Sequence, residues 1–236
     1  IRGGNYRTNN FNELMPTSRA YTEEVTSAIN IGFRCATTEL QNGHSPAEWV
    51  LIHGGTFDMG SISNQNSLPI HTVSVPDFFI MKTEVTVNMF FMCVDSGNCN
   101  GSFSDPGLCI WYSVDRRMPI NCVTYEQANN YCAFVGGRLP SESEWEYAST
   151  SGGQYEFPWG SNALSCELAI FNEDGLGEGC GTGYFMTTCS RESGISPDGL
   201  CDMIGNLSEW VEDCYHRDYS GAPVNGSAWT ENCLEQ

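Results

Sequence analysis

The sequence predicts an α+β domain with few short helices, much irregular structure and several disulfide bonds. Of its 236 residues, 40% are hydrophobic, which is enough to bury a core, and its 25 glycines indicate many turns. Its 12 cysteines are an even number, and no two of them have the close C-x-x-C type of spacing that zinc sites use. Because disulfides of this density form in oxidising compartments, we expect an extracellular, cell-surface or periplasmic protein.

Strands and a first helix are predicted in the segment from residue 56 to residue 95. Thr56–Met59 and Ile70–Met81 alternate between apolar and polar residues, as half-buried strands do, and Pro76 interrupts the second of them. Thr86 is a suitable N-cap, and the apolar pattern after it predicts a short helix over Val87–Asp95.

Two further helices begin at capping boxes. Thr124 with Gln127 predicts a helix over Tyr125–Val135, and Ser141 with Glu144 predicts a third helix that continues through about Ser149. In such a box the cap hydroxyl and the third helical side chain each satisfy a backbone N–H that the helix itself leaves unpaired.

A long loop is predicted over residues 151–200, where Gly, Ser, Asn and Asp dominate and three cysteines occur. Loops of this length in compact domains are normally functional, or are held by covalent bonds or ions.

The chain is strongly acidic. Ten Lys and Arg residues against 29 Asp and Glu residues give a net charge of −19, and Lys82 is the only lysine. Without a basic stripe, neither nucleic-acid binding nor docking on anionic lipid is expected. No apolar run approaches the roughly 20 residues that span a bilayer. The sequence has no signal peptide, so export requires one that was removed or that lies outside this chain.

Several short segments together form a specific pattern along nearly the whole chain. They are Ile1–Tyr6, Ile31–Cys35, Gly55–Gly60, His71–Val75, Thr83–Thr86, Pro119–Thr124, Gly137–Ala148, Phe157–Gly160 and Gly199–Trp210. In this combination they resemble the formylglycine-generating (sulfatase-modifying) family. The resemblance implies that family's fold, a largely irregular α+β domain related to C-type-lectin-like folds.

The order of the segments departs from that of the family. Residues 1–36 match the family's C-terminal segment but come first here, residues 48–236 match its N-terminal and central part, and the polar residues 37–47 predict a linker between the two. We therefore interpret residues 1–236 as one domain in permuted order, because the termini of a domain often lie close together. A circular permutation, one period of a tandem array and an excerpt from a longer protein all fit this order. The last two together are favoured, since a natural N-terminus inside a core motif would be unusual.

The resemblance also implies where a catalytic centre would lie. Enzymes of the family oxidise a substrate cysteine with two cysteines of their own, in a C-x₄-C pattern after a Gly-Gly-Ser-Tyr/Trp segment, that bind copper(I). The matching positions after Gly3-Gly4-Asn5-Tyr6 hold Thr8 and Glu13. A hydroxyl and a carboxylate do not replace two thiolates on this soft metal, so we expect neither copper nor oxidase activity.

A calcium site is implied by the family's Asp/Asn-x-x-Gly-Asn-x-x-Glu-Trp turn. Its ligands carry over to the side chains of Asp202 and Glu209 and the backbone carbonyls of Gly205 and Leu207. Hard oxygen ligands of this kind suit Ca²⁺. The alternative is that Asp202 merely caps a turn and Glu209 pairs with an arginine.

One disulfide follows from the resemblance, which pairs Cys35 with Cys132 and so ties the N-terminal segment to the second helix. For the other cysteines, sequence neighbours give the hypotheses Cys93–Cys99 or Cys93–Cys109, Cys166–Cys180, Cys189–Cys201 and Cys214–Cys233.

Three functions are compatible with these observations. The favoured one is a non-catalytic extracellular structural or binding module, whose partner is a protein, a glycan or, in a surface assembly or fibre, further copies of itself. The second is a divergent oxidoreductase of the family, which needs a metal site that the sequence does not contain. The third, a calcium-dependent carbohydrate-binding module, rests on fold analogy alone.

Overall fold

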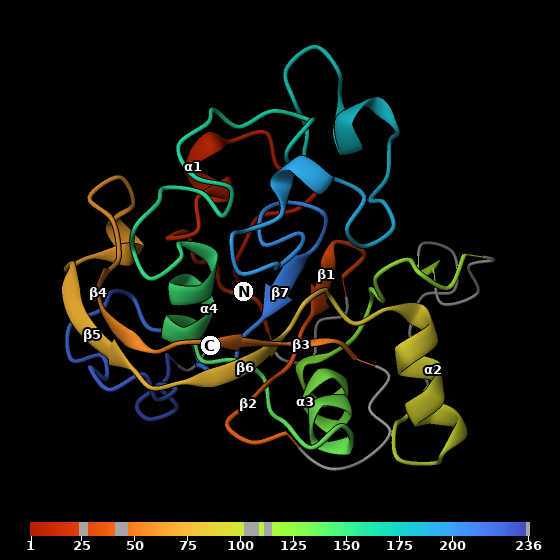
Figure 1. Ribbon diagram of the computed structural model, residues 1–236, viewed down its shortest axis with the longest axis horizontal. Coiled ribbons are helices and arrows are strands. Elements are labelled where there is room, and N and C mark those ends of the chain that lie inside the picture. Colours follow the sequence, from red (N-terminus) through yellow and green to blue (C-terminus); the bar gives the residue numbers. More distant parts are fainter. Residues whose placement is uncertain (24–27, 41–46, 102–108, 111–114, 235–236) are drawn as a thin grey trace.

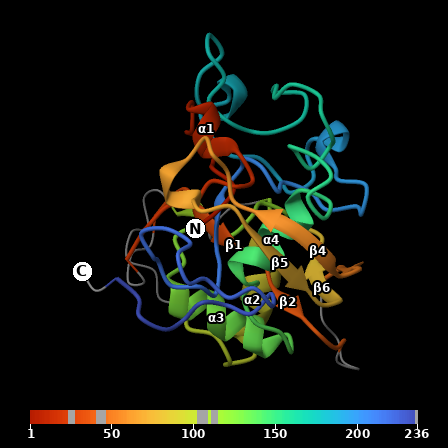
Figure 2. The same cartoon turned by 90° about the vertical axis from the view of Figure 1, so that its left-hand side faces the viewer.

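The computed structural model describes residues 1–23, 28–40, 47–101, 109–110 and 115–234. Within them, short helices and strands are separated by long irregular segments, which confirms the predicted class (Figure 1). Two views at right angles place α2 (Val87–Asp95) and α3 (Tyr125–Phe134) at one end of the molecule, and α1 (Phe11–Leu14) with most of the 151–200 loop at the other (Figures 1 and 2).

The strands of the described residues form three small sheets. One is an antiparallel hairpin of β4 (Gly55–Met59) and β5 (His71–Val75). In the second, β6 (Phe78–Met81) lies between β3 (Trp49–Ile52) and β2 (Ala36–Thr37) and is antiparallel to both. The third joins β1 (Ile31–Phe33) to β7 (Ser208–Trp210) in parallel.

The predicted helices are confirmed with their caps. The hydroxyl of Thr86 accepts a hydrogen bond from the Met89 backbone N–H, and both capping boxes are formed, at Thr124 and at Ser141. The third helix is α4 (Glu142–Ser149), and each of its eight residues is buried. A helix without an exposed face must be packed on every side. Accordingly, α4 lies against the β4–β5 hairpin, with Trp145 in the same apolar cluster as Phe57.

One predicted strand is wrong, and four strands of the structure were not predicted. The segment predicted as one interrupted strand is two strands, β5 and β6, that belong to different sheets. The strands β1, β2, β3 and β7 have two to four residues each, too few for an alternating pattern to be recognised. The predicted loop between residues 151 and 200 contains no strand and only the 3₁₀ turns η3 (Glu178–Gly181) and η4 (Glu192–Gly194).

The predicted linker begins inside a sheet. Thr37 is the last residue of β2 and is paired with Phe79 of β6. Residues 41–46 lie outside the described part of the chain.

The N-terminal segment is built into the core. Ile31 and Phe33 are buried where β1 pairs with β7, and Arg2 forms backbone bridges to both Arg19 and Glu209. Directly after Arg2, the backbone of Gly3 and Gly4 lies close to neighbouring side chains. A Cβ atom on Gly3 would lie 3.0 Å from the Trp145 ring, and one on Gly4 would lie 2.8 Å from the side chain of Leu14. Both glycines also have positive φ, so the Gly-Gly pair is required sterically as well as conformationally.

All twelve cysteines form disulfides. Cys35 is bonded to Cys132 across 97 residues, while Cys93 pairs with Cys99 rather than with Cys109. The remaining bonds are Cys109–Cys122, Cys166–Cys180, Cys189–Cys201 and Cys214–Cys233. This covalent framework indicates a non-cytoplasmic compartment. Among the described residues, no helix has the length and apolar character needed to cross a membrane.

The longest-range disulfide is expected to stabilise the fold most. In the chain-entropy account, closing a loop of this length contributes about 4.7 kcal/mol, against about 2 kcal/mol for the 6-residue separation of Cys93 and Cys99. Replacing Cys35 and Cys132 together with alanine should therefore lower the free energy of unfolding more than the matched replacement of Cys93 and Cys99. Guanidinium unfolding measures both losses. Equal losses would contradict the assignment of Cys35–Cys132 as the main covalent anchor of the N-terminal segment.

Candidate functional site

Thr8 and Glu13, the two positions that match the family's catalytic cysteines, both line one cavity of about 390 Å³. Thr8 is buried, and its hydroxyl accepts a hydrogen bond of 3.0 Å from the Asn5 backbone N–H. Glu13 lies in α1, is exposed, and accepts a bond of 3.1 Å from the Asn10 side chain. The Thr8 hydroxyl and the Glu13 carboxylate are thus each hydrogen-bonded to a residue three positions earlier in the chain.

The walls of this cavity come from distant segments. Gly3, Gly4 and Asn5 contribute one side, Ser18 to Tyr21 another, and Asn64 and Asn66 a third. Asn5 is fixed by its own bonds, since its side-chain amide donates to the hydroxyl of Ser208 and its oxygen accepts from the Arg7 backbone N–H. The cavity is therefore lined mainly by hydroxyl, amide and backbone groups, which can form hydrogen bonds but not a thiolate metal site.

Glu209, a predicted calcium ligand, is held by an arginine in the interior. Arg34 donates from Nε and Nη2 to both carboxylate oxygens at 2.6–3.0 Å, and Trp145 donates from Nε1 to Oε2 at 3.0 Å. Arg34 and Glu209 are both fully buried. Burial alone would lower the pKa of Arg34, but the charge of Glu209 outweighs it and the pKa of the guanidinium is raised. The Arg34 guanidinium is therefore charged at any physiological pH.

The rest of the Arg34 guanidinium is bound by backbone carbonyls. Nη1 donates to Met81 and Lys82, and Nη2 donates to Cys201 at 2.9 Å. One side chain thus connects the end of β6, the turn before β7 and β7 itself.

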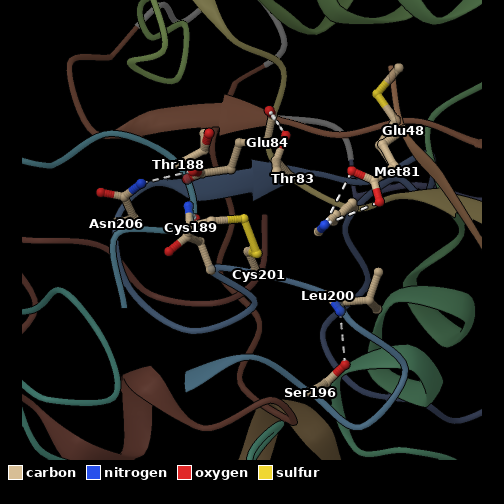
Figure 3. The surroundings of a disulfide bond; sticks show 12 residues. Glu48, Met81, Thr83, Glu84, Thr188, Cys189, Ser196, Leu200, Cys201 and Asn206 are labelled. Atoms are coloured by element: carbon tan, nitrogen blue, oxygen red, sulfur yellow. Dashed lines mark hydrogen bonds and ion pairs between the residues drawn. A yellow bond between two sulfur atoms is a disulfide. The ribbon is translucent and has the colours of Figure 1, made fainter. Parts of the chain in front are cut away.

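Two more buried carboxylates surround this pair. Glu84, which follows β6, accepts a hydrogen bond from the Asn206 side chain at 2.8 Å (Figure 3). It also accepts one from the Leu207 backbone N–H at 3.1 Å. Asp202 accepts from the Cys189 backbone N–H at 2.6 Å, beside the Cys189–Cys201 disulfide. Burial is the main cause that raises the pKa of Asp202 to about 6 and that of Glu84 well above its usual range, and the negative charges of neighbouring carboxylates add to it.

The structure brings the predicted calcium ligands together only in part. Asp202 and the carbonyl groups of Gly205 and Leu207 lie on one turn, but both oxygens of Glu209 are already used by Arg34 and Trp145. Glu209 therefore fits the alternative interpretation, an arginine partner, better than a calcium ligand set. Within the described residues there is no group of three or more His, Cys, Asp or Glu side chains arranged to hold a metal.

Sequence reasoning did not identify Arg34 and Glu84 as parts of this cluster. Both lie inside segments that carry the family resemblance, Gly-Phe-Arg-Cys and Thr-Glu-Val-Thr. In Gly-Phe-Arg-Cys the charged residue stands in an otherwise uncharged, largely apolar motif, and such residues are rarely buried without a partner, which was the signal for Arg34. The polar Thr-Glu-Val-Thr segment gives no comparable signal for Glu84.

A family model described as a sulfatase-modifying factor enzyme 1-like domain matches residues 37–235. The serine/threonine-protein kinase pkn1 of Chlamydia pneumoniae is 30% identical over 191 residues, which cover 73% of this chain and 28% of the kinase. This chain thus spans less than a third of the kinase's length.

Two relatives carry the family's own name. The formylglycine-generating enzyme of Mycobacterium tuberculosis is 26% identical over 223 residues, covering 70% of this chain and 73% of the enzyme. The inactive C-alpha-formylglycine-generating enzyme 2 of Bos taurus is 29% identical over 130 residues, covering 49% of this chain and 40% of that protein. Among solved structures, PvdO from Pseudomonas aeruginosa superposes with a TM-score of 0.66 at 28% identity, covering 82% of this chain and 81% of PvdO.

The arginine of the buried pair should be far more sensitive to substitution than a surface arginine. In Arg34→Met the carboxylate of Glu209 would be left buried without a cation, which typically costs about 3–5 kcal/mol. Arg117→Met is the matched control, because Arg117 pairs with Asp115 on the surface, where the loss of an ion pair changes stability little. Urea unfolding should show a large loss for the first variant and an almost unchanged midpoint for the second. Similar midpoints for the two variants would show that Arg34 is not the centre of this cluster.

Proposed function

The chain belongs to the formylglycine-generating (sulfatase-modifying factor) family, and from this premise we propose that it is a non-catalytic structural or binding module displayed outside the cell. The observation that carries the proposal is the pair Thr8 and Glu13 on the cavity where the family resemblance places two copper-binding thiolates. Oxygen groups of this kind are poor ligands for copper(I).

No other thiol replaces that pair. The twelve cysteines of the chain are all consumed by six disulfides, so the folded protein has no thiolate to offer to a soft metal. A thiol-based oxidase would therefore require at least one disulfide to open first.

The names of the relatives support the idea that proteins with this fold include both enzymes and members without activity. One is named as an enzyme and another as an inactive member of the same family. The match to a part of a kinase supports the further idea that the domain functions as one unit within longer proteins.

We also propose that residues 1–236 form one unit in permuted order. The parallel pairing of β1 with β7 supports it, because Ile31 and Phe33 then belong to the same core as Trp210. A unit of this kind could be repeated in a surface assembly or fibre, with a protein, a glycan or another copy as its partner.

Calcium at the turn after Asp202 is a separate proposal. Its ligands would be the Asp202 carboxylate and the carbonyl oxygens of Gly205 and Leu207, and bound calcium would supply structural cross-linking of this turn. The excess of buried carboxylates around Arg34 supports it, since a cation would offset the mutual repulsion of Glu84 and Asp202.

Copper(I) titration tests the loss of catalysis. In competition with a chromogenic chelator, and with ascorbate keeping the copper reduced, the wild-type chain should bind no copper(I). The double variant Thr8→Cys/Glu13→Cys restores a C-x₄-C thiol pair at the same cavity and should compete for the metal. Tight binding by the wild-type chain would overturn the proposal in favour of a divergent oxidoreductase.

Calcium titration tests the turn. If Asp202 is a ligand, Ca²⁺ should raise the thermal midpoint of the wild-type chain above its value in EDTA, by the equivalent of about 2.7 kcal/mol at a hundred times Kd. Asp202→Asn should abolish the shift, whereas Asp174→Asn, at an exposed loop position, should keep it. If the thermal midpoint of the wild-type chain is the same in Ca²⁺ and in EDTA, the proposed calcium site is refuted, and Arg34 is the cation that compensates these carboxylates.

A further inference from the structure

A second cavity, of about 350 Å³, adjoins the one at Thr8 and Glu13 and shares Arg19, Ala20 and Tyr21 with it. We refer to it as the acidic cavity. Its lining includes aromatic rings and carboxylates, beside the cation Arg19 and several aliphatic residues. The aromatic residues are Tyr21, Tyr125, Trp210 and Tyr215, and the carboxylates include Glu142 and Asp213.

Asp213 is held in place by backbone groups alone. Its Oδ2 accepts a hydrogen bond of 2.6 Å from the N–H of Glu142, and its Oδ1 accepts one of 2.9 Å from the N–H of Trp229. Within the described residues Asp213 forms no ion pair. Burial, with a contribution from the negative charge of Glu142, raises its pKa to about 7.

The cations nearest to Asp213 are already committed to other carboxylates. Arg19 lies 3.0 Å from Glu142, and Arg2 forms a close pair with Glu146 as well as lying 3.6 Å from Glu142. Two arginines thus face three carboxylates in this part of the interior. On the neighbouring wall Arg138 is shared between Glu144 and Glu212, so it adds no free positive charge.

Among the described residues, the arginines around the acidic cavity are thus paired with Glu142, Glu144, Glu146 and Glu212. The carboxylate of Asp213 is left without a cation of its own.

The aromatic walls suit the same kind of ligand as the charge does. Tyr21 is 36% exposed and contacts Tyr215 edge-on at a ring separation of 5.5 Å. The guanidinium of Arg19 already lies over the Tyr215 ring at 5.2 Å, so that ring stabilises a cation in the structure itself. Aromatic faces and an unpaired carboxylate together are the recognition chemistry of an organic cation.

We propose that the acidic cavity binds the basic side chain, lysine or arginine, of a partner polypeptide, with Asp213 as the ion-pair partner and the tyrosines enclosing the alkyl stem. The proposal rests on the function proposed above and names the ligand chemistry of such a module. A partner with basic residues is also the one that the net charge of −19 attracts. The volume fits one long side chain rather than a folded element.

Calorimetric titration of the whole chain with Nα-acetyl-lysine methylamide tests the proposal, with the norleucine derivative as a probe of similar shape without charge. At pH 8 the lysine derivative should bind and the norleucine derivative should not.

The binding should also depend on pH. With a pKa of about 7, Asp213 is ionised to roughly nine-tenths at pH 8 and one-tenth at pH 6, so the affinity for the lysine derivative should fall about tenfold from pH 8 to pH 6. At pH 7, binding should release about half a proton, which titrations in buffers of different ionisation enthalpy measure.

Asp213→Asn should remove both the binding and its pH dependence, whereas Asp174→Asn, which changes the net charge equally, should retain both. If Asp213→Asn does not fold, Tyr21→Ala should weaken binding of the lysine derivative, and the proton release of the wild-type chain still reports on Asp213. Equal binding of the two probes, absence of binding by the lysine derivative, or pH-independent binding would each overturn the proposal. Failure here leaves the copper titration unaffected, so the two proposals can fail separately.

Discussion

The buried pair of Arg34 and Glu209 is the interaction on which the rest of the structure depends. Removing two charges from water is costly, and the cost is met only when every donor of the arginine has a partner. Here the arginine's partners come from β7, from the end of β6 and from the turn at Cys201. Trp145 of α4 donates to the same glutamate. The geometry of this one ion pair therefore fixes how four distant segments are arranged around it.

The same logic explains how an acidic chain uses its few cations. Of ten basic residues, Arg2, Arg19 and Arg34 are buried, and each faces a buried glutamate. Arg2 and Arg19 hold the N-terminal segment against α4, while Arg34 holds β7. Because these cations are used inside, the surface that remains for partners is dominated by carboxylates, which favours basic partners over anionic ones.

The two adjoining cavities lie where the N-terminal segment meets the rest of the molecule. One carries Thr8 and Glu13 and is lined mainly by hydrogen-bonding groups; the other carries Asp213 among aromatic rings. They share a wall, Arg19 to Tyr21, so a ligand in one would contact the segment that also borders the other. This junction therefore brings polar and aromatic groups together at one place, which is where we place recognition of a partner.

Features that depend on neighbours along the chain could be predicted from the sequence. The capping boxes at Thr124 and Ser141 fixed the starts of α3 and α4, because each box is complete within four residues. The family motifs likewise determined the fold, and twelve cysteines determined that the chain is heavily cross-linked. Only the tertiary structure decided the partner of Glu209, the pairing of β1 with β7 and the environment of Asp213. Arg34 and Glu209 are 175 residues apart, strands of three residues have no pattern of their own, and the pKa of a carboxylate depends on burial that no local pattern encodes.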